Sequence, residues 1–175
     1  MTSGTANGVE VLLRFQSNLS TGNFEGAEAF LHEDFFVKEV ECFPYRGVYK
    51  GAEGWWKLTS VVNSYWNFHT IELVRSFSAP SGPSSDEETV CLMVNIKSLC
   101  RRNRMELDMK IVEIWTVKDG LLLSVEPYFW DTSEMMRILE TEGTDTEEGQ
   151  DHGGFETVSF GVGPELADRW AKINP

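Results

Sequence analysis

The sequence predicts an α+β domain in which a curved antiparallel sheet is covered on one face by three N-terminal helices. Apolar residues recur at helical spacing as far as residue 68, and long runs of strand-like composition follow as far as residue 130. Helices first and a meander of strands afterwards are typical of α+β folds. No internal repeat is visible, and 175 residues with 41% apolar content suit one domain with a sizeable core.

Three helices are expected. The first covers residues 9–20 and the second residues 23–34, where Asn23 serves as the N-cap because its side chain accepts a hydrogen bond from the first turn. The third covers residues 51–68, after a loop rich in proline and glycine, and its apolar stripe faces the sheet.

Five strands are expected, and the opening strand carries two glutamates, Glu39 and Glu41. It lies at residues 35–41, with the sequence FFVKEVE. Alternate residues of a strand point to the same face, so Phe35, Val37 and Glu39 share one side. Four longer strands follow as a meander, at residues 69–80, 88–100, 105–117 and 121–130.

The last hairpin indicates which face of the sheet is covered. Its KDG turn fits a three-residue loop with Gly120 in the left-handed conformation, so that Val117 pairs with Leu121 and Glu113 with Val125. Paired residues share a face, and the opposite face is half polar with enough apolar area for a subunit interface. The covered face is apolar except for one carboxylate, and consists of Leu107, Met109, Ile111, Glu113, Trp115, Val117, Leu121, Leu123, Val125, Pro127 and Phe129.

The composition excludes several classes of partner. A formal net charge of −13 and a pI near 4.6 argue against nucleic acid and anionic membranes, because their phosphates would repel the protein. No apolar run approaches the roughly 20 residues that span a bilayer. The polar start MTSGTANG shows no signal or transit peptide, so we expect a cytoplasmic protein.

Neither a metal site nor a cofactor is expected. The three cysteines are odd in number and lack CxxC spacing, which is typical of reduced thiols. The three histidines are scattered and lack the spacing of metal ligands.

The chain divides into three parts. The domain is expected at residues 1–140, an acidic low-complexity linker at residues 141–154, and a C-terminal extension at residues 155–175. The extension contains GPELADRWAKI, whose pattern fits a short amphipathic helix that docks on the domain or contacts another subunit.

Two carboxylates on the covered face, Glu39 and Glu113, are the candidate catalytic groups. Burial penalises the charged form of a carboxylate and raises its pKa. Two such groups with separated pKa values act as general base and general acid near neutral pH. The structural alternatives are a Glu113 that only hydrogen-bonds a neighbouring tyrosine, tryptophan or backbone group, and a Glu39 that pairs with Arg46 or Lys50 at the edge of the sheet.

Two sequence motifs are fairly specific for a known fold. One is FPYRGVYKG at residues 43–51, and the other joins the turn at Asp119-Gly120 to PYFWDT at residues 127–132. Over roughly residues 8–140 the chain resembles the SnoaL-like branch of the nuclear transport factor 2 superfamily, which includes ketosteroid isomerases and polyketide cyclases. The resemblance implies a cone-shaped curved sheet, enclosed by three helices around an apolar pocket, and a homodimer formed through the outer face of the sheet.

The resemblance also assigns roles to residues. Glu39 matches the opening-strand acid that shuttles the proton in ketosteroid isomerases, and Glu113 falls where their second acid donates to the oxyanion. Their helix-one tyrosine falls on Phe15, which has no hydroxyl, so steroid isomerisation of that kind is not expected. Tyr45 and His69 complete the candidate catalytic set. The candidate substrate-binding residues are Phe15, Trp55, Tyr65, Trp66, Met109, Trp115, Val125 and Phe129.

The leading hypothesis is a small cofactor-free isomerase or cyclase that acts on a hydrophobic, carbonyl-bearing molecule, such as a polyketide or terpenoid intermediate. Glu39 would move the proton, and a neutral Glu113 would stabilise the oxyanion. The alternative is a binding module of the same fold, which holds an apolar ligand or serves as a dimeric scaffold without chemistry. A third hypothesis places the C-terminal helix in the pocket of its own or a neighbouring subunit.

Overall fold

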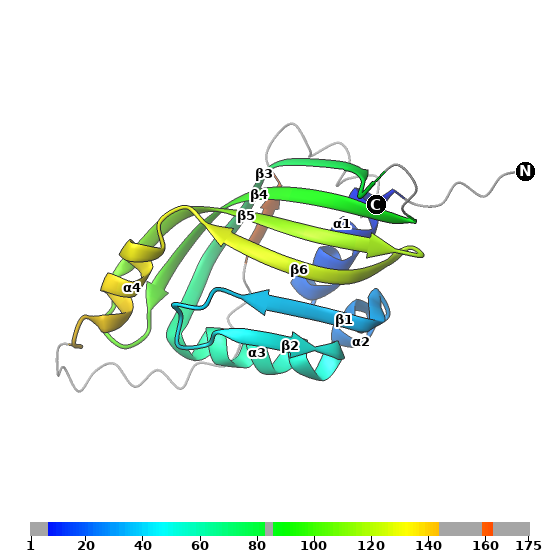
Figure 1. Ribbon diagram of the computed structural model, residues 1–175. Helices are drawn as coiled ribbons and strands as arrows, with labels where there is room; N and C mark the ends of the chain where they lie inside the picture. Colours follow the sequence, from blue (N-terminus) through cyan, green and yellow to red (C-terminus); the bar gives the residue numbers. More distant parts are fainter. Residues whose placement is uncertain (1–6, 83–85, 144–158, 163–175) are drawn as a thin grey trace, which may run out of the picture.

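An open, curved sheet bends around the helices of the protein (Figure 1). The computed structural model describes residues 7–82, 86–143 and 159–162. The α+β class is confirmed. The helices are α1 (Gly8–Ser20), α2 (Phe24–Glu28), α3 (Gly51–Tyr65) and α4 (Thr132–Glu140), and the strands are β1 (Leu31–Glu39), β2 (Gly47–Lys50), β3 (Trp66–Pro80), β4 (Glu87–Cys100), β5 (Glu106–Lys118), β6 (Leu121–Phe129) and β7 (Ser159–Val162).

The seven strands follow the order β2-β1-β6-β5-β4-β3-β7. The sheet is largely antiparallel, as predicted, but β1 pairs in parallel with β6 and β7 pairs in parallel with β3. The meander from β3 to β6 is antiparallel, as predicted. β1 therefore lies inside the sheet, between β2 and β6, and not at its edge.

The predicted first helix is confirmed. Asn7 caps it by accepting a hydrogen bond from the Glu10 backbone N–H at 3.0 Å, and Leu12, Leu13 and Phe15 are fully buried. The start of the helix is tied to β4 because the Gly8 N–H donates to the Glu88 carboxylate at 2.6 Å. These contacts fix α1 against the covered face of the sheet.

The second and third helices are shorter than predicted. Asn23 does cap α2, since it accepts from the Gly26 N–H at 3.1 Å, but the chain leaves the helix at Glu28 and enters β1 at Leu31. Pairing with the neighbouring strand β6 overrides the helical pattern there. Likewise the third helix ends at Tyr65 and not at residue 68, because Trp66 begins β3, where it pairs with Cys100.

The last hairpin has a different register from the predicted one. The loop contains two residues, Asp119 and Gly120, which both have positive φ (52° and 77°), as a type I′ turn requires. Leu122 is the fully buried partner of Val117, so the prediction that Leu121 and Leu123 face inward was wrong.

An irregularity follows the turn and restores the predicted faces. Trp115 pairs with Val125 and Glu113 pairs with Pro127, a shift of two residues from the prediction. Because strand side chains alternate with a period of two, a two-residue shift keeps the same residues on the same face. The covered face from Val125 onward is therefore the predicted one.

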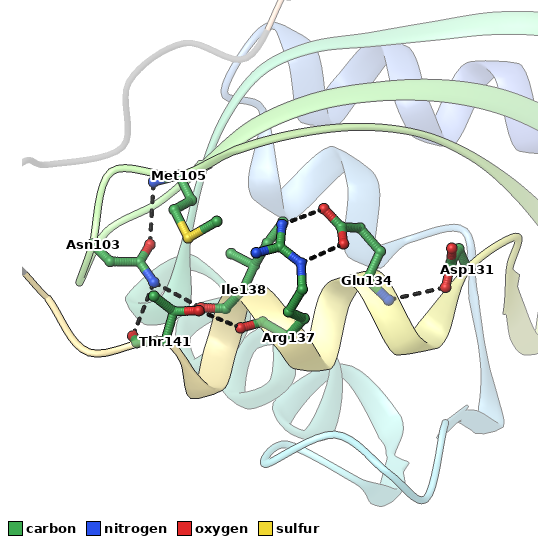
Figure 2. Close-up of polar contacts among 7 residues, drawn as sticks. All are labelled: Asn103, Met105, Asp131, Glu134, Arg137, Ile138 and Thr141. Atoms are coloured by element: carbon green, nitrogen blue, oxygen red, sulfur yellow. Dashed lines mark hydrogen bonds and ion pairs between the residues drawn. The ribbon is translucent and has the colours of Figure 1, made fainter.

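Helix α4 was not predicted, and it closes one end of the sheet (Figure 1). Asp131 caps it by accepting from the Glu134 N–H at 2.9 Å, and the Arg137 guanidinium pairs with the Glu134 carboxylate (Figure 2). At its other end, the Asn103 amide donates to the carbonyls of Ile138 and Thr141 at 2.7 and 3.0 Å. The hairpin between β4 and β5 thus holds the C-terminal turn of α4.

The C-terminal extension contributes β7, which was not predicted either. It pairs with residues 70–73 of β3. The helix predicted at GPELADRWAKI lies outside the described residues. Among the residues that the structure describes, no helix is long and apolar enough to cross a membrane.

Candidate functional site

A cavity of about 540 Å³ lies between the covered face of the sheet and the helices. Its walls come from the C-terminal part of α1, from α3, and from the inner residues of β1 and β3–β6. They are chiefly apolar, with Val94, Ile111, Trp115 and Phe129 on the sheet side. A cavity of this size and lining is typical of a binding site for a small apolar molecule.

The entrance to the cavity lies where its lining residues are solvent-accessible. These residues are at the turn after α1, in α2 and on α3. Phe24 and Trp56 meet there edge to face, with ring centroids 5.2 Å apart, and the Trp56 indole donates to the Glu28 carboxylate. Gln16, in the last part of α1, adds a polar side chain to the cavity wall.

Glu39 points into this cavity from the end of β1. The alternation that places it beside Phe35 and Val37 is confirmed, because all three side chains are buried. Burial raises the pKa of Glu39 from its ordinary value of 4.5 to about 7, and the negative charge of Glu113 adds to this effect. The Val40 N–H, at 3.3 Å, lowers the pKa, and this effect is larger than that of the Glu113 charge. Within the described part of the chain, no cation pairs with Glu39.

Glu113 enters the same cavity from β5. Its side chain is half-buried where it lines the cavity, and burial raises its pKa. The Trp115 indole N–H donates to its Oε2 atom at 2.9 Å and partly offsets the effect of burial. One oxygen of the Glu113 carboxylate is therefore hydrogen-bonded to a neighbouring tryptophan, as the structural alternative expects. The residue also lines the cavity.

The strand register explains why the two carboxylates interact. Val37 on β1 is level with Val125 on β6, so two residues further along Glu39 is level with Pro127. Pro127 in turn pairs with Glu113 on β5. The two Cα atoms are therefore two strand spacings apart, about 10 Å, and both side chains project from the same concave face. Longer side chains on such a face converge over the residue between them.

Tyr45, in the loop after β1, lines the cavity beside this pair. Its side chain is 3% exposed, and its hydroxyl oxygen accepts a hydrogen bond from the Trp66 indole N–H at 3.3 Å. Burial and the nearby charge of Glu39 both raise the pKa of the Tyr45 hydroxyl. The phenol is therefore neutral at physiological pH.

Comparison with known proteins identifies the fold. No protein-family model and no curated protein matches the chain. Solved structures do match, among them a nuclear transport factor 2-like protein from Burkholderia thailandensis, with a TM-score of 0.62 at 16% identity over 75% of this chain and 95% of that one. The protein has the nuclear transport factor 2-like fold.

Two further structures share this fold. One is a nuclear transport factor 2-like protein from Burkholderia xenovorans, with a TM-score of 0.60 at 17% identity over 78% of this chain and 98% of that one. The other is the protein TerC, co-crystallized with polyporic acid, with a TM-score of 0.53 at 20% identity over 76% of this chain and 98% of that one. At these identities the likeness concerns the fold alone.

Within this fold, most of the predicted site residues meet in one place. Three of the four candidate catalytic residues lie in the cavity wall, and so do five of the eight candidate substrate-binding residues. The predicted residues that line the cavity are Glu39, Glu113, Tyr45, Trp55, Trp66, Trp115, Val125 and Phe129.

Four predicted residues lie outside the cavity wall. Phe15 is fully buried behind it, with its ring 5.4 Å from Trp55 and 5.8 Å from Trp115. Tyr65 packs against the ring of Tyr45 at 5.7 Å. Met109 belongs to the core near the start of β5. His69 is exposed, at an irregularity of β3 between Phe68 and Thr70. An irregularity turns side chains away from simple alternation, which explains the placement of His69.

The sequence reasoning missed Met135, which is 2% exposed and lines the cavity from α4. A signal for it was present. Asp131 followed by Glu134 is a helix start, and the apolar residues Met135, Ile138 and Leu139 recur at helical spacing. Among the described residues, no cluster of histidine, cysteine or acidic side chains could hold a metal ion.

Proposed function

We propose that the protein is a small acid–base enzyme that moves a proton on an apolar, carbonyl-bearing molecule, in an isomerisation or cyclisation. The observation that carries the proposal is the placement of Glu39 and Glu113 in one apolar cavity. Groups whose pKa values are shifted by burial and by each other are enriched in catalytic sites. The structural alternative of a solvated or ion-paired Glu39 does not account for its burial.

Glu39 is the group that moves the proton. With a pKa of about 7, it is half ionised at neutral pH, so it can both take a proton and return it. A carboxylate in an apolar cavity is also a stronger base than one in water, because burial removes most of the solvation of its charge.

Glu113 acts with Glu39 as a pair that keeps one proton near neutral pH. Two negative charges in the same apolar cavity repel each other, so the second ionisation is harder than the first. The pair therefore presents a carboxylate and a neutral carboxyl group at the same time. An acid–base reaction requires both forms in one site, because the carboxylate takes a proton and the neutral carboxyl group donates one.

The ligand class follows from the cavity wall. Aromatic and aliphatic side chains select an apolar molecule, and the carboxyl pair requires a polarised C–H or O–H bond next to a carbonyl group. A polyketide or terpenoid intermediate meets both requirements. The protein TerC, which shares the fold, was co-crystallized with polyporic acid.

Hydrogen–deuterium exchange into an apolar ketone tests the proposal. In D₂O, the protein should speed exchange of the methyl protons of 2-acetylnaphthalene, and Glu39→Gln should lower the rate by about 100-fold or more. Glu41→Gln is the matched control, because Glu41 is two residues away on the same segment and exposed. Bound ketone without exchange above the background would instead indicate the alternative function, a binding module.

We also propose that the protein forms a homodimer through the outer face of the sheet. Met93, Val112 and Tyr128 are consecutive pairing partners across β4, β5 and β6, so they form one apolar row. Tyr128 is 56% exposed and Trp130 is 83% exposed. Exposed aromatic residues beside such a row are typical of an interaction surface.

A further inference from the structure

Tyr45 carries a buried hydroxyl group whose own proton has no acceptor among the described residues. Its oxygen accepts from Trp66, but the hydroxyl donates to no group in that part of the chain. A buried hydrogen-bond donor without an acceptor destabilises the folded protein by roughly 1–3 kcal/mol. Such donors are therefore rare unless a ligand or water accepts the hydrogen bond. Both Trp66 and Glu39, whose charge acts on the hydroxyl, line the cavity.

The hydroxyl is held in a fixed position from several sides. At one end of the residue, the Tyr49 hydroxyl donates to the Tyr45 carbonyl at 2.9 Å. The ring packs between Phe43, with centroids 5.3 Å apart, and Tyr65 at 5.7 Å. At the other end the Trp66 indole occupies one lone pair of the oxygen. A donor that is fixed before the ligand arrives needs no reorganisation during a reaction.

We propose that Tyr45 donates the hydrogen bond that holds the carbonyl oxygen of the ligand, and that Trp66 is the positioning residue that orients the Tyr45 hydroxyl. The assignment rests on the proposed function, since this oxygen must belong to the carbonyl group next to the carbon that Glu39 deprotonates. It narrows the ligand to an apolar ketone with a hydrogen on the adjacent carbon.

The step balances without a cofactor or a second reactant. Glu39 takes the proton, the C–H bond breaks, and its electron pair forms a C=C bond while the carbonyl π pair moves to the oxygen. Tyr45 keeps its proton and donates a stronger hydrogen bond to the enolate oxygen than to the ketone. Return of the proton from Glu39 to the same or a conjugated carbon completes exchange or isomerisation.

The carbonyl stretching band of bound 2-acetylnaphthalene tests the hydrogen bond directly. Labelling the carbonyl with ¹³C separates its band from the protein amide bands in a difference spectrum. In the unmodified protein the band should lie at lower wavenumber than in an apolar solvent, because a donor weakens the C=O bond. Tyr45→Phe should abolish this displacement and lower the exchange rate by about 100-fold, as removal of an oxyanion donor does.

Tyr128→Phe is the matched control, because Tyr128 is exposed on the outer face of the sheet and does not line the cavity. It should leave the band and the exchange rate unchanged. Trp66→Phe retains an aromatic ring without the N–H and should move the band part of the way back. A thermal melt of each variant checks that it is folded, and a structural role alone would not move the band.

The outcomes separate this inference from the proposed function. An unchanged band in a folded Tyr45→Phe variant overturns the role of Tyr45, even if exchange still depends on Glu39. A displaced band with exchange that does not depend on Glu39 overturns the proposed chemistry and leaves Tyr45 as a ligand contact. Failure of the ketone to bind the unmodified protein overturns the ligand class and this inference with it.

Discussion

Glu39 and Glu113 project from the same face of the sheet on either side of Pro127, with only strand β6 between them. The relationship arises from two different pairings, one parallel and one antiparallel. It places two acids from distant parts of the chain in one apolar cavity. Because each charge makes the other costlier, the pair has pH-dependent properties that a single buried carboxylate would not have.

The first prediction concerns the pH dependence of the reaction. Exchange into 2-acetylnaphthalene should become faster as the pH rises through about 7, because Glu39 acts as base in its ionised form. Glu113→Gln removes a charge that raises the pKa of Glu39, so the midpoint of the profile should move to lower pH. Rate profiles between pH 5 and 9 measure both effects. An unmoved midpoint in the variant would show that the two carboxylates are not coupled.

The second prediction concerns stability. The pKa of Glu39 is higher in the folded protein than in the unfolded chain, so the folded state binds more protons between about pH 4.5 and 7. The contribution of Glu39 is therefore complete below pH 4.5 and is lost as the pH rises through 7, by on the order of 3 kcal/mol. Burial of Glu113 acts in the same direction.

Urea unfolding at pH 5 and pH 8 measures this change. Glu39→Gln should reduce the difference in unfolding free energy between the two pH values, because glutamine does not ionise. It should also stabilise the protein at pH 8, while it removes exchange activity. Glu41→Gln should leave the difference as it is, since Glu41 is exposed. An identical pH dependence in the Glu39 variant would mean that its carboxylate is solvated.

Local patterns predicted the faces of the sheet better than its pairings. Alternation alone placed Phe35, Val37 and Glu39 together, and the structure buries all three. The register of the last hairpin depended on the turn, where Asp119 adopts positive φ and shortens the loop by one residue. A compensating irregularity between Val117 and Thr116 then preserved the face of Glu113. No sequence pattern indicated that irregularity.

The cavity itself could not be derived from periodicity. A wall residue and a core residue have the same apolar character, so Phe15 and Trp55 looked alike although only Trp55 lines the cavity. The distinction depends on how the helices pack against the sheet over the whole domain. Polar residues are more informative, because burial of Glu39, Glu113 and Tyr45 needs an explanation that burial of an alkyl side chain does not.

The third prediction concerns α4, which closes the cavity through Met135. Asn103→Ala removes two hydrogen bonds to the last turn of α4 and should destabilise the protein by about 1–3 kcal/mol. Amide hydrogen exchange should rise in residues 132–140 more than in β4. Arg137→Ala, which removes an exposed ion pair on the same helix, should have a smaller effect. Equal effects of the two variants would show that Asn103 does not anchor the helix.

The fourth prediction concerns the outer face of the sheet, where the apolar row of Met93, Val112 and Tyr128 crosses three strands. If two copies associate there, Val112→Arg places an unpaired charge at the centre of each copy of the interface. Sedimentation velocity should show a dimer for the unmodified protein and a monomer for this variant. Lys57→Glu alters an exposed charge on α3, away from this face, and should leave the dimer intact. A monomeric unmodified protein at micromolar concentration would rule the interface out, and the exposure of Trp130 would then need another partner.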